Sequence, residues 1–303
     1  MEKKTLTVFT PAYNRGYIIH KCYESLCRQT SKDFVWLVVD DGSTDNTAQL
    51  IKEWQKQDNG FEIKYIYKEN GGMHTAHNTA YENIDTELNV CIDSDDYMPD
   101  DAVEKIISFW RKNGSDKFAG IIALDVYESD GKVIGAELPN KKSTTLMGYY
   151  NNGGSGDKKL IYRTDVINAT PKYPEFEGEK YVGLAYKYHI VDETKGLLIM
   201  NEPVCIVDYQ DSGSSANMWK QYYNNPKGFA FFRISEMKYQ SGLELFKTCV
   251  HYVSSSILAK NYNFISESPR KLQTVLAIPA GYVLSVVNKY KVKKNSSFTM
   301  KVE

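Results

Sequence analysis

Acidic side chains gather in the stretch NVCIDSDDYMPDDA, residues 89–102, directly behind a short apolar run. The run VCI has the character of a buried strand, whereas Asp93, Asp95 and Asp96 follow it at once. Carboxylates this close repel one another, and burying them without a partner is costly. The sequence therefore predicts a positive charge here, either a basic group of the protein or a bound cation.

The alternating carboxylates of Asp93-Ser94-Asp95 suit a hard divalent cation. Mg²⁺ and Mn²⁺ prefer oxygen ligands, and Mg²⁺ is commonly held by one or two carboxylates together with substrate phosphates. We therefore expect Asp95 and Asp93 to bind Mn²⁺ or Mg²⁺, which would neutralise the cluster and attract a diphosphate. Surface loops often contain such a pair by chance, so the surroundings must support the assignment.

Those surroundings alternate between continuous apolar runs and helical periodicity. Strands are expected within residues 5–14, 34–41, 61–68 and 88–93, and helices within 16–29, 47–57, 73–84 and 99–113, where Pro99 is placed to open the helix. Buried strands joined by helices predict an α/β fold with a doubly wound, mostly parallel sheet, to which we add a small antiparallel part and a C-terminal helical extension. In such a sheet ligands bind outside the carboxyl ends of the strands. That rule selects residues 10–13, 40–43, 69–72 and 93–96, which hold the chain's unusual side chains.

Beyond residue 118 the pattern changes. FAGIIALDVYESDGKVIG predicts two strands around an Asp-Gly turn, and a Gly/Asn-rich loop at 151–159 could shape an acceptor pocket. From Trp219 the chain has helical character to its end. We predict a catalytic domain over 1–218, with a nucleotide-binding half (1–115) and an acceptor-binding half (116–218), and a C-terminal helical region over 219–303.

Four motifs together resemble the family 2 glycosyltransferases, which have the GT-A fold. They are VFTPAYNR, LVVDDGSTDNT, ENGG with HN behind it, and IDSDDYMPDDA, in this order and spacing. The resemblance covers residues 5–115 and becomes thin after them. It implies an inverting hexosyl- or N-acetylhexosaminyltransferase that uses a UDP-sugar donor. The acceptor would be a glycan or a lipid-linked molecule in bacterial cell-surface polysaccharide synthesis.

The resemblance also implies roles for residues of the donor site. Tyr13 would stack on the uracil, Asp41 would accept a hydrogen bond from its N–H, and Asp93 would face the ribose or the metal. Tyr13 as a plain strand cap and Asp41 as a plain turn residue are the simpler alternatives. The implied donor-binding residues are Pro11, Ala12, Tyr13, Asp41, Asn70, Gly71, Asn78, Asp93 and Ser94.

An inverting transfer also needs a base that deprotonates the acceptor hydroxyl. Relatives usually place it in an acidic pair, often Glu-Asp, before a helix, but in FEGEKYVG Lys180 stands where an Asp is expected. Glu179 is then the first candidate and Glu177 the second, with a solvated carboxylate in a first helical turn as the alternative for Glu179. The loop YQDSGSS, 209–215, resembles one that closes over donor and acceptor, although a plain exit loop explains it equally well. Its candidate contacts are Asp211 and Ser214.

Composition limits the alternatives. A net charge of −1 argues against nucleic-acid binding, which needs a basic face. Five cysteines without a CxxC pair indicate free thiols in a reducing compartment, and the start of the chain lacks the apolar run of a signal peptide. The apolar, basic segment 268–294 suits contact with a membrane surface or packing on the protein. We therefore expect a cytoplasmic protein, either free or peripheral on the inner face of the cell membrane, and leave an oligomer open.

Other classes of protein fit less well. A sugar nucleotidyltransferase usually has a Gly-rich basic loop after the first strand, which TPAYNRGY does not provide. A dinucleotide-dependent dehydrogenase would need GxGxxG at that place. A non-catalytic sugar-nucleotide-binding or scaffold protein remains as an alternative, but retention of Asp93 and Asp95 favours the enzyme.

Overall fold

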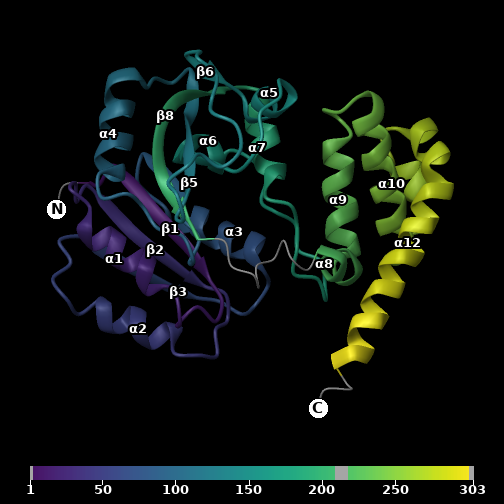
Figure 1. Ribbon diagram of the computed structural model, residues 1–303, viewed down its shortest axis with the longest axis horizontal. Helices are drawn as coiled ribbons and strands as arrows, with labels where there is room; N and C mark the ends of the chain where they lie inside the picture. The colour runs from purple at the N-terminus through teal and green to yellow at the C-terminus, as the bar shows by residue number, and fades with distance from the viewer. Residues whose placement is uncertain (1–2, 209–217, 300–303) are drawn as a thin grey trace. The chain divides into compact units, whose positions relative to one another are not determined.

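The computed structural model describes residues 3–208 and 218–299, drawn in Figure 1. They fall into two compact units, one of residues 3–172 and 187–208 and the other of residues 173–186 and 218–299. The segment 173–186 thus groups with the C-terminal helices. The predicted division between residues 218 and 219 stays a prediction.

The first unit is built on an eight-stranded sheet in the order β3-β2-β1-β4-β7-β5-β8-β6. Its strands are β1 (Leu6–Ala12), β2 (Phe34–Asp40), β3 (Glu62–Tyr67), β4 (Leu88–Cys91), β5 (Phe118–Tyr127), β6 (Ser143–Thr144), β7 (Lys158–Arg163) and β8 (Gly196–Val207). The helices between them are α1 (His20–Arg28), α2 (Thr47–Trp54), α3 (Met73–Asn83), α4 (Ala102–Asn113), α5 (Leu146–Asn151), α6 (Thr164–Asn168) and α7 (Ala185–Asp192), whose first residues belong to the second unit.

Strand directions confirm the predicted fold class. β1 is parallel to β2 and β4, β2 is parallel to β3, and β5 is parallel to β8, whereas β7 runs antiparallel between β4 and β5. The short β6 is antiparallel to β8. The α/β fold with a mostly parallel sheet and a small antiparallel part is therefore as expected.

Two local predictions were wrong. α4 begins at Ala102 rather than at Pro99, whose carbonyl instead accepts a bond from the Ala102 N–H at 3.0 Å. The chain after β5 turns back without a second strand, and only an isolated bridge joins Val126 to Val133. The turn itself closes through the Gly131 N–H and the Tyr127 carbonyl, at 2.9 Å. The returning segment buries Ile134, whose N–H donates to the Asp125 carbonyl at 2.9 Å, and the Tyr127 N–H donates to the Lys132 carbonyl at 2.9 Å. Most of its other residues are exposed, so the pairing does not extend into a strand.

The apolar runs of the sequence are explained by burial on both faces of the sheet. Every residue of β1 and β2 is buried. The ring of Trp36 in β2 is fully buried, and Tyr23 of α1 stacks on Trp54 of α2 with ring centroids 4.1 Å apart. Truncating such a buried ring typically costs about 3–5 kcal/mol. This rigid layer holds the polar loops that follow β1 and β2.

The second unit is helical, and it confirms the predicted helical C-terminus. Its helices are α8 (Met218–Asn224), α9 (Pro226–Glu236), α10 (Gly242–Leu258), α11 (Phe264–Glu267) and α12 (Lys271–Thr299). Tyr252 and Val253 of α10 pack in one apolar cluster with Met237 and Ala277. Within the described residues, no helix combines the length and the apolar character needed to cross a bilayer.

Candidate functional site

The loops that follow β1 and β2 are fastened to each other. Asn14 has a left-handed backbone (φ 52°), which Asn tolerates better than most residues. Its N–H donates to Ser43 Oγ at 2.8 Å, and its side-chain oxygen accepts the Thr44 N–H at 2.8 Å. Pro11 and Ala12 are buried at the end of β1, whereas the Tyr13 side chain is 48% exposed. The predicted stacking residue therefore offers a free ring at the carboxyl edge.

Asp41 holds the Asn-Gly-Gly turn in place. One of its oxygens accepts bonds from Lys68 Nζ at 2.6 Å and from the Gly71 N–H at 3.0 Å, and the other accepts the Gly72 N–H at 2.7 Å. Asn70 Nδ2 donates to the Asp41 carbonyl at 2.7 Å. A carboxylate has about four acceptor positions, and three are used. The carboxylate thus organises the turn and still has capacity for one further donor.

The same turn approaches Gly42 so closely that a side chain would not fit. Gly42 has φ +82°, and a Cβ atom there would lie 2.8 Å from the Asn70 nitrogen. Asn78 lies further along, on α3, where it is buried and lines a cavity of about 200 Å³ together with Tyr81 and Lys187. Asn70 and Gly71 are therefore at the predicted edge, whereas Asn78 lies within α3 and lines this cavity.

The acidic loop after β4 lies at this carboxyl edge. Ser94 and Asp96 are buried, whereas Asp93 and Asp95 are half-buried. The Asp96 N–H donates to the Asp93 carbonyl at 3.0 Å, which closes the loop into a turn. Tyr97 then pairs with β8 through two backbone bonds of 3.1 and 2.7 Å. The loop is therefore fixed at both ends, with carboxylates presented between.

A buried lysine supplies the positive charge that the sequence required. Lys159 of β7 places its Nζ 3.8 Å from Asp125 Oδ2, and their side chains are only 12% and 2% exposed. Burial raises the pKa of Asp96 to about 8 and that of Asp125 to about 6, while the charge of Lys159 acts in the opposite direction on both. Burial likewise raises the pKa of Asp93, again opposed by Lys159. Of the two options that the sequence offered, the basic group is present.

Sequence reasoning missed Lys159 and Asp125. Signals were visible, because Lys158-Lys159 opens a strand and Asp125 interrupts the apolar run IIALDVY. Nothing in their spacing pairs them, however, since they meet only through the antiparallel pairing of β5 with β7. Lys68, the partner of Asp41, was also missed, because the spacing of these two residues in the sequence does not indicate that they pair.

The carboxylates also fit a divalent cation. Among residues 3–208 and 218–299, no three His, Cys, Asp or Glu side chains are arranged to hold an ion by themselves. A divalent cation can be held by one or two carboxylates together with oxygens of a diphosphate and water. Asp93 and Asp95 provide such oxygens at the edge of the sheet.

The two candidate bases belong to the second unit. Glu179 accepts bonds from the N–H groups of Lys227 and Gly228 at 2.9 and 2.8 Å. These are orphan donors in the first turn of α9, where a carboxylate also favours the helix dipole. Glu179 is thus a cap for a helix far from it in sequence, and Glu177 is exposed in the same turn. The two predicted loop contacts, Asp211 and Ser214, lie outside the described residues.

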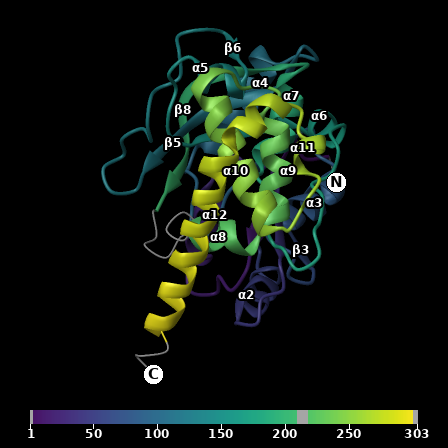
Figure 2. The ribbon, with the colours of Figure 1, turned by 90° about the vertical axis from the view of Figure 1, so that its right-hand side faces the viewer.

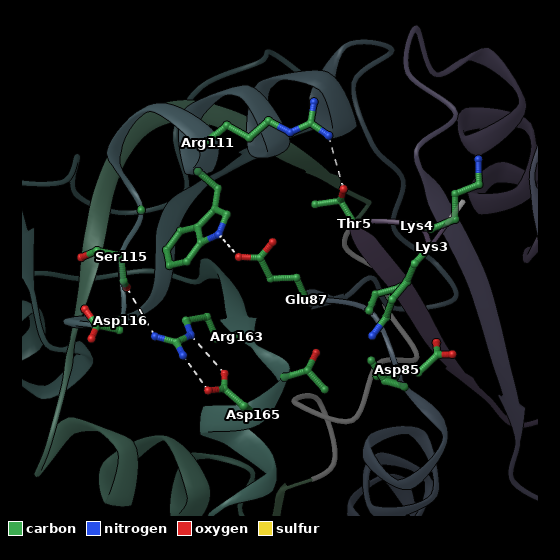
Figure 3. A pocket seen from close by; sticks show the side chains of 15 residues that line it. Lys3, Lys4, Thr5, Asp85, Glu87, Arg111, Ser115, Asp116, Arg163 and Asp165 are labelled. Atoms are coloured by element: carbon green, nitrogen blue, oxygen red, sulfur yellow. Dashed lines mark hydrogen bonds and ion pairs between the residues drawn. The ribbon is translucent and has the colours of Figure 1, made fainter. Parts of the chain in front are cut away.

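A cavity of about 850 Å³ lies at the opposite, amino-terminal edge of the sheet (Figure 3). Its charged side chains are largely paired within the protein. Arg163 makes two bonds to Asp165 at 3.0 and 2.6 Å, and Glu87 accepts the Trp110 indole N–H at 2.6 Å. Because these groups already satisfy one another and ligands of doubly wound sheets bind at the carboxyl edge, we assign no ligand to this cavity.

The sheet with its carboxyl-edge loops is that of a GT-A glycosyltransferase. The model of the family described as "Glycosyl transferase family 2" matches residues 7–169, more than half of the chain. The chain belongs to this family.

Curated relatives match the first part of the chain. The glycosyltransferase GlyA of Streptococcus pneumoniae serotype 4 is 38% identical over 101 residues, covering 33% of this chain and 14% of that protein. The chondroitin synthase of Escherichia coli is 34% identical over 108 residues, covering 36% of this chain and 16% of that protein. This chain therefore matches only a small part of each relative.

Solved structures match almost the whole chain. S. aureus TarS 1-349, in complex with UDP-GlcNAc, aligns with a TM-score of 0.60 and 16% identity, covering 97% of this chain and 92% of that one. The mannosyltransferase PcManGT of Pyrobaculum calidifontis, in complex with GDP-Man and Mn²⁺, aligns with a TM-score of 0.54 and 15% identity, covering 99% and 81%. At these identities the likeness shows the fold.

Proposed function

We propose that the protein transfers a sugar from a UDP-sugar to a glycan or lipid-linked acceptor in cell-surface polysaccharide synthesis. The observation that carries this is the convergence, at one edge of the sheet, of the exposed Tyr13 ring, the turn held by Asp41 and the Asp93–Asp95 loop. The Tyr13 ring suits stacking on a nucleobase, the turn suits contact with a ribose, and the acidic loop suits a metal-bound diphosphate. The UDP-GlcNAc bound to TarS and the name of the chondroitin synthase support the donor and the product class.

We further propose Mn²⁺ or Mg²⁺ as the cofactor, held by Asp95 and Asp93. When bound, the cation would offset the negative charge that develops on the departing diphosphate. Pro11 and Ala12 would border the uracil ring that stacks on Tyr13. Asn70, Gly71 and Ser94 would contact the nucleoside. Asn78 would act from α3. The Mn²⁺ in the PcManGT complex supports this choice of metal.

For the acceptor we propose an inverting attack, assisted by a carboxylate that takes the hydroxyl proton. Glu179 is the first candidate and Glu177 the second. The bonds from Lys227 and Gly228 hold Glu179 in one orientation, which suits a base but serves a cap equally well. Contacts of Asp211 or Ser214 with phosphate or acceptor remain part of this proposal. So does the division into a donor half (1–115) and an acceptor half (116–218).

A cytoplasmic protein that works at the inner face of the membrane would suit a lipid-linked acceptor. The segment 268–294, which forms most of α12, supports this setting, because it is largely apolar and ends in lysines. Whether the protein forms an oligomer does not enter the proposal.

The donor site is tested by calorimetry of UDP with Mn²⁺ present and absent. We expect metal-dependent binding that is lost in Asp95→Ala and kept in Asp100→Ala, an exposed aspartate of the same acidic stretch. UDP that fails to bind in the presence of Mn²⁺ would refute the choice of donor. Equal binding by the wild type and Asp95→Ala would refute the metal site. A screen of UDP-sugars on the wild type then identifies the sugar.

A further inference from the structure

The longest helix of the second unit exposes its apolar side chains. Along α12 these are Leu272, Val275, Leu276, Tyr282, Val283, Val286 and Tyr290, each between 45% and 69% exposed. Most of these positions are three, four or seven residues from another of the set, which places them along one side of a helix. We call this set the outer stripe. Figure 2 shows α12, in yellow, running alongside α10.

The buried side of α12 has the opposite character. It consists of Thr274, Ala277, Gly281, Ser285 and Asn288, which are small or polar. They face α10 at close range. A Cβ atom on Gly281 would lie 2.5 Å from Val253 Cγ1, and Asn288 Nδ2 reaches Ser254 Oγ at 3.5 Å. α12 therefore packs mainly through small and polar residues, with Ile278 partly buried against the apolar cluster, and turns most of its large apolar residues outward.

Water does not favour this arrangement. A surface helix in water normally buries its apolar side and exposes its polar side. Helices in apolar surroundings instead pack through small residues and short polar side chains, and present large apolar residues to the lipid. The contact between α12 and α10 follows the second pattern. Since no described helix combines the length and apolar character needed to span a bilayer, and α12 contains Pro279, the pattern points to a helix lying in the membrane interface.

Charge identifies the kind of surface. Residues 271–299 contain lysines at 271, 289, 291, 293 and 294 and no aspartate or glutamate, although the whole chain has a net charge of −1. Each lysine near an anionic lipid surface contributes about 1 kcal/mol. A second copy of this chain would bring lysines and no carboxylates to the same stripe, so charge favours an anionic lipid surface over a second copy.

We propose that α12 lies in the interface of an anionic membrane, with the outer stripe in the acyl boundary and its lysines at the lipid phosphates. The proposal deepens the membrane contact given under the proposed function, and it does not depend on UDP binding or sugar transfer.

The experiment is sedimentation of the full chain with vesicles of phosphatidylcholine, with and without phosphatidylglycerol. We expect the protein to bind the vesicles that contain phosphatidylglycerol. Its affinity for vesicles of phosphatidylcholine alone should be at least tenfold weaker. Leu276→Gln should weaken binding about tenfold, and Leu276→Gln with Val283→Gln and Val286→Gln about a hundredfold or more. Lys271→Gln with Lys289→Gln should weaken it about 25-fold.

Leu243→Gln is the matched control, because Leu243 is 67% exposed on α10 while Leu276 is 63% exposed on α12. It should bind vesicles as the wild type does, and all variants should keep the wild-type melting temperature and UDP affinity. Failure of the wild type to bind phosphatidylglycerol vesicles would overturn the proposal, and so would an equal loss in Leu243→Gln. A dimer in solution that Leu276→Gln dissociates, without vesicle binding, would assign the stripe to a second copy instead.

Discussion

Removing the charge of Lys159 is the sharpest test of how the acidic cluster is tolerated. In Lys159→Met the side chain keeps its length but no longer faces Asp125 with a charge. At 3.8 Å and an effective dielectric constant of about 20, the lost attraction is about 4 kcal/mol. Breaking a buried pair by removing one partner typically costs about 3–5 kcal/mol. For a unit of this size we expect the melting temperature to fall by about 10 °C at pH 8.

The assay is thermal unfolding in EDTA and in Mn²⁺. If the carboxylates around Lys159 also bind the cation, Mn²⁺ should restore more stability to Lys159→Met than to the wild type. Lys158→Met is the control, since Lys158 is also buried but donates to the Ile134 and Ser155 carbonyls. It should lose stability without any extra gain from Mn²⁺. A melting temperature of Lys159→Met within about 2 °C of the wild type in EDTA would refute the counter-charge argument.

Three further predictions concern the donor, the base and the pH dependence of stability. Tyr13→Ala should weaken UDP binding in calorimetry by about tenfold or more, since stacking on a base is worth about 1–3 kcal/mol, while Tyr13→Phe should bind normally. Glu179→Gln should lower kcat by at least a hundredfold and the melting temperature by only a few degrees. Glu177→Gln should change neither kcat nor the melting temperature. If the loss of activity in Glu179→Gln only follows a loss of folded protein, Glu179 is a helix cap and not the base. Burial lowers the pKa of His77 to about 3, so the unfolded chain binds more protons below about pH 6.5 and the fold loses stability as the pH falls. Between pH 8 and 4.5 the free energy of unfolding, measured with urea, should therefore fall by about 2–3 kcal/mol more in the wild type than in His77→Gln. If the free energies of both proteins changed equally with pH, the lowered pKa of His77 would be contradicted.

Much of the carboxyl edge of the sheet could be predicted from local patterns. Continuous apolar runs such as FVWLVVD identify strands buried on both faces, and those strands are observed. Once the strands are parallel, their carboxyl ends must meet at one edge. The grouping of Tyr13, Asp41 and Asp93 therefore follows from element order and strand direction alone. The error at Pro99 shows the limit, because a helix start depends on the local turn and not only on periodicity.

Only the tertiary structure decided which charges meet. Lys159 reaches Asp125 because β7 turns antiparallel between β4 and β5, and Glu179 reaches the start of α9 across a long stretch of chain. Periodicity gives the side of an element on which a residue lies, but not the partner that this side will face. α12 shows the same division, since its residues predict a helix while the outward direction of Leu276 depends on the packing of Gly281 against α10. The sequence by itself determined the elements and the edge of the sheet at which the polar and acidic loops gather. Long-range packing determined the counter-charge, the cap and the exposed stripe.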